Sequence, residues 1–176
     1  ALSSAASDVY KRQVVLIAPK KGDEKVSSFK DITKADTIAL GDPKSVPAGQ
    51  YAQEILTNLK NWNDVKKKAS FGTNVTEVLN WVAKGSASCG VVYATDAASV
   101  ADQVEIIAEA SSDMLETPVL YPVGMIEDEE ALPEEKVAAE TFFEYLQTEN
   151  ALKVFEEHGF SPYTCLLYTS DAADDK

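Results

Sequence analysis

The 176-residue sequence is poor in the residues that most often bind metals or form disulfides, and in positive charge. It has one histidine and two cysteines, Cys89 and Cys165, which is too few for a disulfide framework. Its 16 basic residues face 29 acidic ones, for a formal net charge of −13. This balance argues against nucleic acid or an anionic membrane as a partner. No apolar run approaches the roughly 20 residues that span a bilayer, and no signal peptide is visible.

The side chains that are present do not form a catalytic pattern. There is no glycine-rich phosphate loop, and the carboxylates show no spacing typical of paired acid–base chemistry. His158 precedes Gly159, where a cation stabilises a helix C-terminus, so we assign it that structural role. Cys89 lies in an apolar run with no neighbouring base and is interpreted as a small core residue. We expect no catalysis and no cofactor.

Short apolar runs alternate with helical repeats along the chain. Apolar residues make up 45% and charged residues 26%, as in ordinary globular domains. The pattern predicts strands at 13–18, 37–40, 87–93, 104–108 and 119–126, and helices at 27–32, 47–60, 74–84 and within 136–158. Residues 62–68 are a short amphipathic piece, and residues 70–72 are a brief strand or a link. This alternation predicts an α/β fold with a mostly parallel or mixed sheet. We expect the runs at 37–40, 87–93 and 104–108 to be neighbouring strands of one sheet.

The chain is organised around the stretch from Ala39 to Ala52, ALGDPKSVPAGQYA. It predicts a strand end, a tight turn and a helix whose first turn contains Pro47. Ser45 or Val46 would be the N-cap, because the hydroxyl favours the first and Pro47 at the first helical position favours the second. Helix starts carry unpaired N–H groups that suit an anion. By itself the pattern favours a routine strand–helix junction.

Further motifs change this interpretation, because together they resemble the molybdate-binding proteins that serve ABC importers. Five motifs carry the resemblance: Gly41-Asp42-Pro43 with Val46-Pro47-Ala48-Gly49-Gln50-Tyr51-Ala52, Thr73-Asn74-Val75, GVVYATDA at 90–97, Tyr121-Pro122-Val123, and FEEHGF at 155–160. The resemblance covers residues 14 to 162, in the family's order. It implies the two-lobed α/β fold of periplasmic binding proteins, with the ligand held in the cleft between the lobes.

The resemblance also implies the residues of the site. Ala48 and Val75 match positions whose backbone N–H groups donate to the oxyanion at helix starts, and Tyr93 matches a position whose phenol donates. Neutral donors at helix ends can hold a tetrahedral dianion, and an array without acceptors favours fully ionised ligands. These residues would meet molybdenum or tungsten only as the oxyanion, and sulfate is not distinguished.

The same template divides the chain. Residues 13–19 would be the outgoing crossing strand, 20–117 the second lobe, 118–126 the returning strand, and 127–164 the last helices of the first lobe. Residues 1–12 and 165–176 resemble translated sequencing-adapter strings, so both ends are expected to be non-native. The part of the first lobe upstream of Val14 would be missing, together with two serine-bearing loops that face the oxyanion. On this interpretation the chain is a truncated fragment with half of a binding site.

Three functions are compatible with these patterns. The first is an extracytoplasmic binding protein, periplasmic or membrane-anchored, that captures molybdate or tungstate as a monomer and delivers it to an ABC importer permease. The second is an oxyanion-sensing regulatory module of the same fold, and the third is an enzyme on an α/β scaffold. The motifs favour the first. The absence of a catalytic pattern argues against the third.

Overall fold

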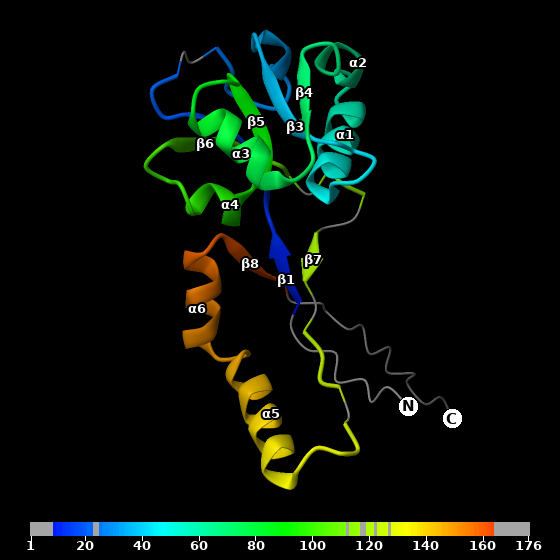
Figure 1. Cartoon of the computed structure of the whole chain (residues 1–176), viewed down its shortest axis with the longest axis vertical. Coiled ribbons are helices and arrows are strands. Elements are labelled where there is room, and N and C mark those ends of the chain that lie inside the picture. The colour runs from blue at the N-terminus through cyan, green and yellow to red at the C-terminus, as the bar shows by residue number, and fades with distance from the viewer. Residues whose placement is uncertain are drawn as a thin grey trace, which may run out of the picture.

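The computed structural model describes residues 9–22, 25–111, 113–116, 119–121, 123–126 and 128–163. These residues form a five-stranded sheet with the strand order β4-β3-β5-β2-β6 and a separate three-stranded sheet with the order β7-β1-β8 (Figure 1). The strands are β1 (Val9–Arg12), β2 (Val14–Pro19), β3 (Ile38–Gly41), β4 (Ala69–Gly72), β5 (Cys89–Tyr93), β6 (Val104–Glu109), β7 (Leu120–Tyr121) and β8 (Phe160–Tyr163). The helices are η1 (Ile32–Lys34), α1 (Pro47–Asn58), α2 (Trp62–Val65), α3 (Val75–Ala83), α4 (Ala94–Ala98), α5 (Pro133–Tyr145) and α6 (Glu149–Glu157).

The five-stranded sheet has an apolar core on each face. Successive side chains of a strand point to opposite faces, so Leu16 of β2 lies in the core on the α1 face while Val15 and Ile17 lie in the core on the α3 face. The α1 face also buries Phe29 and Ile32, as the sequence predicts for the 27–32 segment. Cys89 is fully buried here, and burial, with a contribution from the charge of Asp31, raises the pKa of its thiol to about 12. Its interpretation as a core residue is confirmed.

The predicted α/β architecture is confirmed, with one correction to the strand order. The runs at 37–40, 87–93 and 104–108 are strands of one sheet, and β3 pairs with β5. β5 and β6 are not neighbours, however, because β2 lies between them and pairs antiparallel with both. We expected residues 13–19 to be a crossing strand between lobes. Residues 14–19 form β2, an inner strand of this sheet, because Val14–Ile17 are apolar and buried on both faces. Since β2 follows directly on β1 of the other sheet, the crossing role stays a prediction.

The three-stranded sheet uses residues that we expected to lie outside the fold. β1 pairs antiparallel with β7 and β8. It belongs to the segment 1–12, which we expected to be a non-native leader. The Arg12 N–H donates to the Val119 carbonyl at 2.9 Å, which fixes β1 beside the start of β7. The predicted strand at 119–126 is shorter than expected, since β7 covers only Leu120–Tyr121. The segment 165–176 lies outside the described residues.

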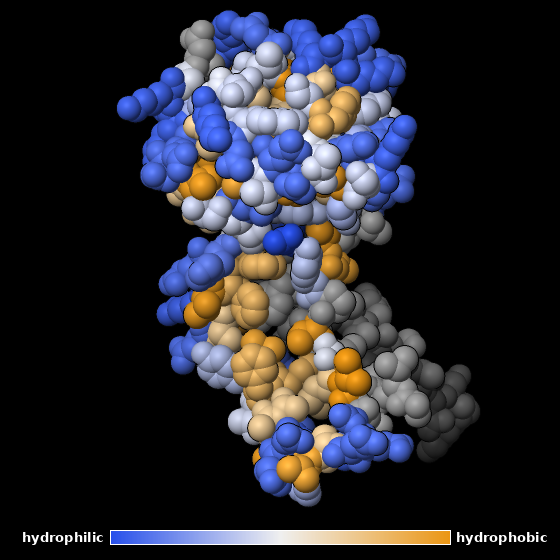
Figure 2. Space-filling view, viewed as in Figure 1, coloured by the Kyte–Doolittle hydropathy of each residue, from blue (hydrophilic) through white to orange (hydrophobic). Residues whose placement is uncertain are grey.

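The C-terminal helices extend away from both sheets (Figure 1). Helices α5 and α6 form where helices are predicted, although α5 begins at Pro133, before the predicted range 136–158. Few of their apolar side chains are covered: Phe142 is 61% and Tyr145 49% exposed. Figure 2 shows hydrophobic side chains gathered over this part of the surface. None of the helices in the described ranges combines the length and the apolar character that crossing a bilayer requires.

Because β1 is the middle strand of the small sheet, it is expected to hold β7 and β8 in place. Replacing residues 1–11 with a glycine–serine segment of equal length should abolish amide protection in β7 and β8 while leaving β3 and β5 protected. Hydrogen exchange followed by NMR measures both effects. The same replacement at 165–176 is the control and should change neither sheet. Unchanged protection of β8 without β1 would show that the pairing is not needed.

Candidate oxyanion-binding site

Three parallel strands end at one edge of the five-stranded sheet. β3 pairs in parallel with β4, with Gly41 opposite Gly72, and in parallel with β5, with Ala39 opposite Gly90. Parallel strands advance together, so the carboxyl ends of β3, β4 and β5 lie at nearly the same level. Helix α4 begins directly after β5, whereas α3 follows β4 after residues 73–74 and α1 follows β3 after the turn at 42–46. In open α/β sheets, ligands bind beyond the carboxyl ends of the strands, at the point where the helices that follow two neighbouring strands cover opposite faces of the sheet. Helices α1 and α3 cover opposite faces here.

The start of α1 is held by the turn that follows β3. Asp42 organises this turn, because its carbonyl accepts the N–H groups of Ser45 (3.1 Å) and Val46 (2.8 Å). Val46 has extended backbone geometry and is the N-cap, which decides between the two candidates that the sequence left open. Within α1 the first N–H groups have no intrahelical acceptor. The Ala48 N–H, at the second helical position, is one of these groups without an intrahelical acceptor. The Ala48 side chain is fully buried.

Two glycines let α1 begin so close to the end of β3. The Gly49 α-carbon rests against the Gly41 carbonyl group, and a β-carbon at Gly49 would collide with it. A β-carbon at Gly41 would lie 2.7 Å from a Val46 methyl carbon, which is closer than real contacts allow. The motif glycines therefore set the position of the α1 start relative to the sheet.

The start of α3 has a reciprocal cap. The Asn74 side chain accepts the Glu77 N–H at 2.9 Å, and the Glu77 carboxylate accepts the Thr73 N–H at 2.8 Å. The two bonds resemble a capping box, with the Glu77 carboxylate bound to the residue before the N-cap. The cap satisfies the third N–H of α3. Those of Val75 and Thr76, at the first two helical positions, have no acceptor within the helix.

Tyr93 ends β5 beside these helix starts. Its side chain is 5% exposed and belongs to the same buried cluster as Ala48. Burial raises the pKa of its phenol above the ordinary range, with smaller contributions from the nearby Tyr121 and Tyr51, while the charge of Arg12 acts in the opposite direction. The phenol is thus a neutral hydrogen-bond donor throughout the physiological range.

Sequence reasoning missed Arg12, the only arginine of the chain. Its guanidinium carbon lies 4.6 Å from the ring centroid of Tyr93 and 4.9 Å from that of Tyr121, distances at which a cation is attracted to an aromatic face. Its Nη1 donates to the Tyr121 hydroxyl at 3.0 Å. Its buried Nε has no hydrogen-bond partner among the described residues. The residue was missed because it falls in the segment 1–12, which had been set aside.

The structure thus brings the three predicted site residues to one edge of one sheet. Ala48 and Tyr93 are buried together, and Val75 is half-buried and packs against the cores of both faces. In Figure 1 this edge faces the three-stranded sheet. Within the part of the chain that the structure describes, no group of three or more His, Cys, Asp or Glu side chains is placed to hold a metal ion.

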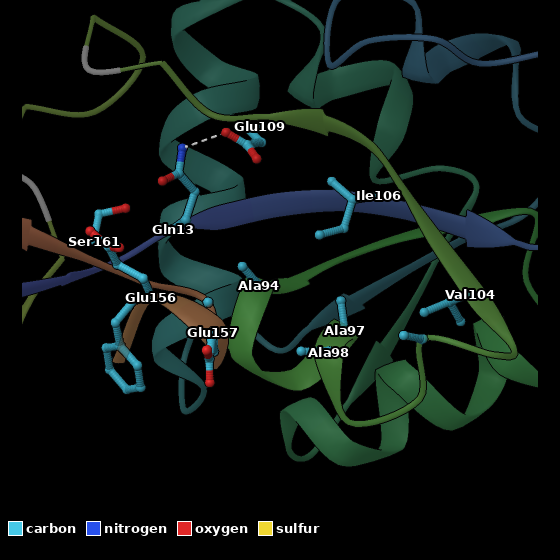
Figure 3. Close-up of a pocket in the computed structure, with 13 residues that line it drawn as sticks. Gln13, Ala94, Ala97, Ala98, Val104, Ile106, Glu109, Glu156, Glu157 and Ser161 are labelled. Atoms are coloured by element: carbon cyan, nitrogen blue, oxygen red, sulfur yellow. Dashed lines mark hydrogen bonds between the residues drawn. The ribbon is translucent and has the colours of Figure 1, made fainter. Parts of the chain in front are cut away.

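A groove of about 500 Å³ lies elsewhere, at the junction between the five-stranded sheet and α6 (Figure 3). Alanines of α4 line one side, and Gln13 donates to Glu109 at 3.0 Å across another. Its ionisable lining residues, Glu109, Glu156 and Glu157, are all acidic. Negative charge without a cation is unsuited to an oxyanion, so this groove is not the predicted site.

The fold and this edge place the chain in a class of α/β proteins in which several helices start beyond the carboxyl ends of parallel strands. The comparison with known families identifies it further. Residues 1–161 match the family described as bacterial extracellular solute-binding proteins, and the chain belongs to that family.

Individual relatives agree with this assignment. The chain is 42% identical over 156 residues to YvgL of Bacillus subtilis, named as an ABC transporter substrate-binding lipoprotein, covering 89% of this chain and 58% of YvgL. It is 36% identical to the molybdate-binding protein ModA of Haemophilus influenzae, covering 84% of this chain and 58% of ModA. The chain therefore spans a little more than half the length of these two relatives.

Solved structures show the same fold. The substrate-binding domain assigned to a molybdenum ABC transporter of Clostridium difficile superposes with a TM-score of 0.79 at 37% identity, covering 93% of this chain and 69% of that one. The periplasmic molybdate-binding protein of Azotobacter vinelandii gives a TM-score of 0.65 at 16% identity, covering 93% of this chain and 71% of that one. At that identity the likeness shows the fold alone.

Gly49→Ala tests how the α1 start is positioned. Alanine normally stabilises a helix over glycine by about 0.5–1 kcal/mol, but a methyl group forced into occupied space costs about 1–3 kcal/mol. We expect a net loss of unfolding free energy, measured by urea denaturation. Gln50→Ala, at the exposed neighbouring position, is the control and should stay within about 0.5 kcal/mol. A stabilised Gly49→Ala variant would contradict the close contact.

Proposed function

We propose that this chain carries one side of the binding site of a solute-binding protein that captures molybdate, or tungstate, for an ABC importer. The observation that carries the proposal is the meeting of two helix N-termini, those of α1 and α3, with the end of β5 at Tyr93. The names of the H. influenzae and C. difficile relatives supply the ligand class. The backbone N–H groups of Ala48 and Val75 and the phenol of Tyr93 are the proposed donors.

The donor set suits a fully ionised oxyanion. Each helix N-terminus carries about half a positive charge, and two of them oppose the charge of a dianion without a cationic side chain. Backbone N–H groups and a neutral phenol donate hydrogen bonds but do not accept them here. A protonated oxyanion would therefore have an O–H group without an acceptor, which costs binding free energy. The raised pKa of Tyr93 keeps its phenol protonated as this role requires.

The remaining features of the proposal follow from the family. Its members are solute-binding proteins described as extracellular, and we propose an extracytoplasmic, periplasmic or membrane-anchored protein that is monomeric and not an enzyme. An importer permease is the proposed protein partner, and no nucleic acid is expected. The regulatory alternative has support only at the level of the fold, from a two-component signalling protein at 17% identity.

The exposed apolar side chains of α5 suggest that more chain completes the protein. We propose that an N-terminal segment, of the kind that the longer relatives contain, covers Phe142 and Tyr145 and supplies the opposing serine donors that the resemblance implies. The extended chain is defined here as residues 9–176, which keep β1 and Arg12, preceded by the part of the C. difficile relative that comes before the position matching Val9.

In the extended chain, Tyr93→Phe should weaken molybdate binding. A hydrogen bond to a charged group contributes about 1.5–3 kcal/mol, so calorimetry should show a loss of roughly 10- to 150-fold in affinity. Ser86→Ala, which removes an exposed hydroxyl beyond the C-terminal end of α3, is the control and should bind as the parent does. Unchanged affinity of Tyr93→Phe would remove Tyr93 from the site.

The 176-residue chain alone should bind molybdate weakly or not at all. Two missing hydrogen bonds to the anion correspond to roughly 3–6 kcal/mol, or about 10²- to 10⁴-fold in affinity, before lost exclusion of water is counted. Calorimetry on the chain and on the extended chain measures the difference. Tight one-to-one binding by the 176-residue chain would show that the opposing donors are not needed.

A further inference from the structure

The turn between α6 and β8 contains a glycine whose backbone conformation few other residues adopt. Helix α6 ends at the C-cap His158, and the Gly159 N–H donates to the Glu156 carbonyl at 3.0 Å. Gly159 has a φ of +85°, in the left-handed region that favours glycine. The sequence places it in the FEEHGF motif, which the proposed donor set does not use.

The same glycine touches the first turn of α4. A β-carbon at Gly159 would lie 2.9 Å from the Ala94 carbonyl carbon and 2.9 Å from the Thr95 nitrogen, and 3.2 Å from the Ala94 β-carbon. The Ala94–Thr95 peptide is backbone and cannot move aside by changing a rotamer. Glycine is therefore required here for its space as well as for its conformation.

This contact lies one residue from Tyr93. Ala94 follows Tyr93 directly, and the Ala94 N–H donates to the carbonyl of Gln13, the residue between β1 and β2, at 2.9 Å. On the other side of Gly159, Phe160 begins β8 and pairs with Arg12 of β1. Figure 3 shows Ala94, Gln13 and Ser161 around the groove at this junction. The Gly159 turn thus joins the C-terminal segment to the backbone that positions Tyr93.

We propose that Gly159 is a positioning residue for the candidate oxyanion site: its contact with the Ala94–Thr95 peptide fixes the first turn of α4 and, through it, the Tyr93 phenol. This inference rests on the proposed function for the identity of the ligand, but the contact itself does not depend on any ligand. Substitution at Gly159 displaces either the turn or the start of α4, and in both cases Tyr93 loses its fixed place relative to the starts of α1 and α3.

The chain offers a matched control. Gly85 also has a positive φ, of +70°, but a β-carbon there would meet nothing within 4 Å. Gly85→Ala therefore measures the cost of the left-handed conformation alone, and Gly159→Ala adds the steric contact. A methyl group forced into occupied space shifts an equilibrium by roughly 5- to 150-fold, and that is the excess expected for Gly159→Ala.

The first readout is ligand-free amide exchange in the 176-residue chain. In Gly159→Ala the amides of Ala94 and Ala97 should exchange roughly 5- to 150-fold faster than in Gly85→Ala, while those of β3 stay protected in both. Equal exchange in the two variants would overturn the positioning role. Loss of protection throughout the five-stranded sheet would also overturn it, because Gly159 would then be a general folding requirement.

The second readout is molybdate affinity in the extended chain. Gly159→Ala should weaken binding and Gly85→Ala should not, and equal affinities of the two variants would overturn the coupling to the site. If the parent extended chain binds no molybdate, the proposed function fails, whereas the exchange measurement still decides whether Gly159 fixes α4. The two failures are therefore distinguishable.

Discussion

The parallel pairing of β3 with both β4 and β5 is the constraint on which the rest of the structure depends. Parallel strands need crossover connections, and a crossover in one sheet is right-handed. The connection from β3 to β4 and that from β4 to β5 run in opposite directions across the sheet, so α1 and α3 cover opposite faces. Both helices nevertheless start at the same edge. That two helices start beside each other at this edge thus follows from topology, before any side chain is considered.

The distribution of charge is compatible with the proposed anion site in a strongly acidic chain. Residues 14–111, which contain the whole five-stranded sheet, carry 11 basic and 12 acidic residues, whereas residues 112–163 carry 2 basic and 13 acidic ones. Most of the net charge therefore lies on the C-terminal helices and their loops, and salt screens such charge beyond about 8–10 Å. At the candidate site the fixed dipoles of α1 and α3 act at close range.

The sequence predicted the elements whose signals are local. Continuous apolar runs indicated β3 and β5 because these strands are buried on both faces. Pro47 indicated the start of α1, because proline fits the first turn of a helix. The sequence predicted the strand β2 but not its partners β5 and β6, because an apolar run does not reveal which strands it pairs with. α4 was not predicted since five residues are too few for a helical repeat. β1 and Arg12 were missed because strand pairing is non-local, and nothing within residues 1–12 reveals it.

An NMR titration of the ¹⁵N-labelled extended chain with molybdate tests the central claim most directly. The account predicts that the amide signals of Ala48 and Val75 shift most, that both saturate with one midpoint, and that signals at the acidic groove, such as that of Glu109, stay unchanged. Shifts centred on the groove, or separate midpoints for Ala48 and Val75, would contradict a single oxyanion site at the carboxyl edge of the sheet.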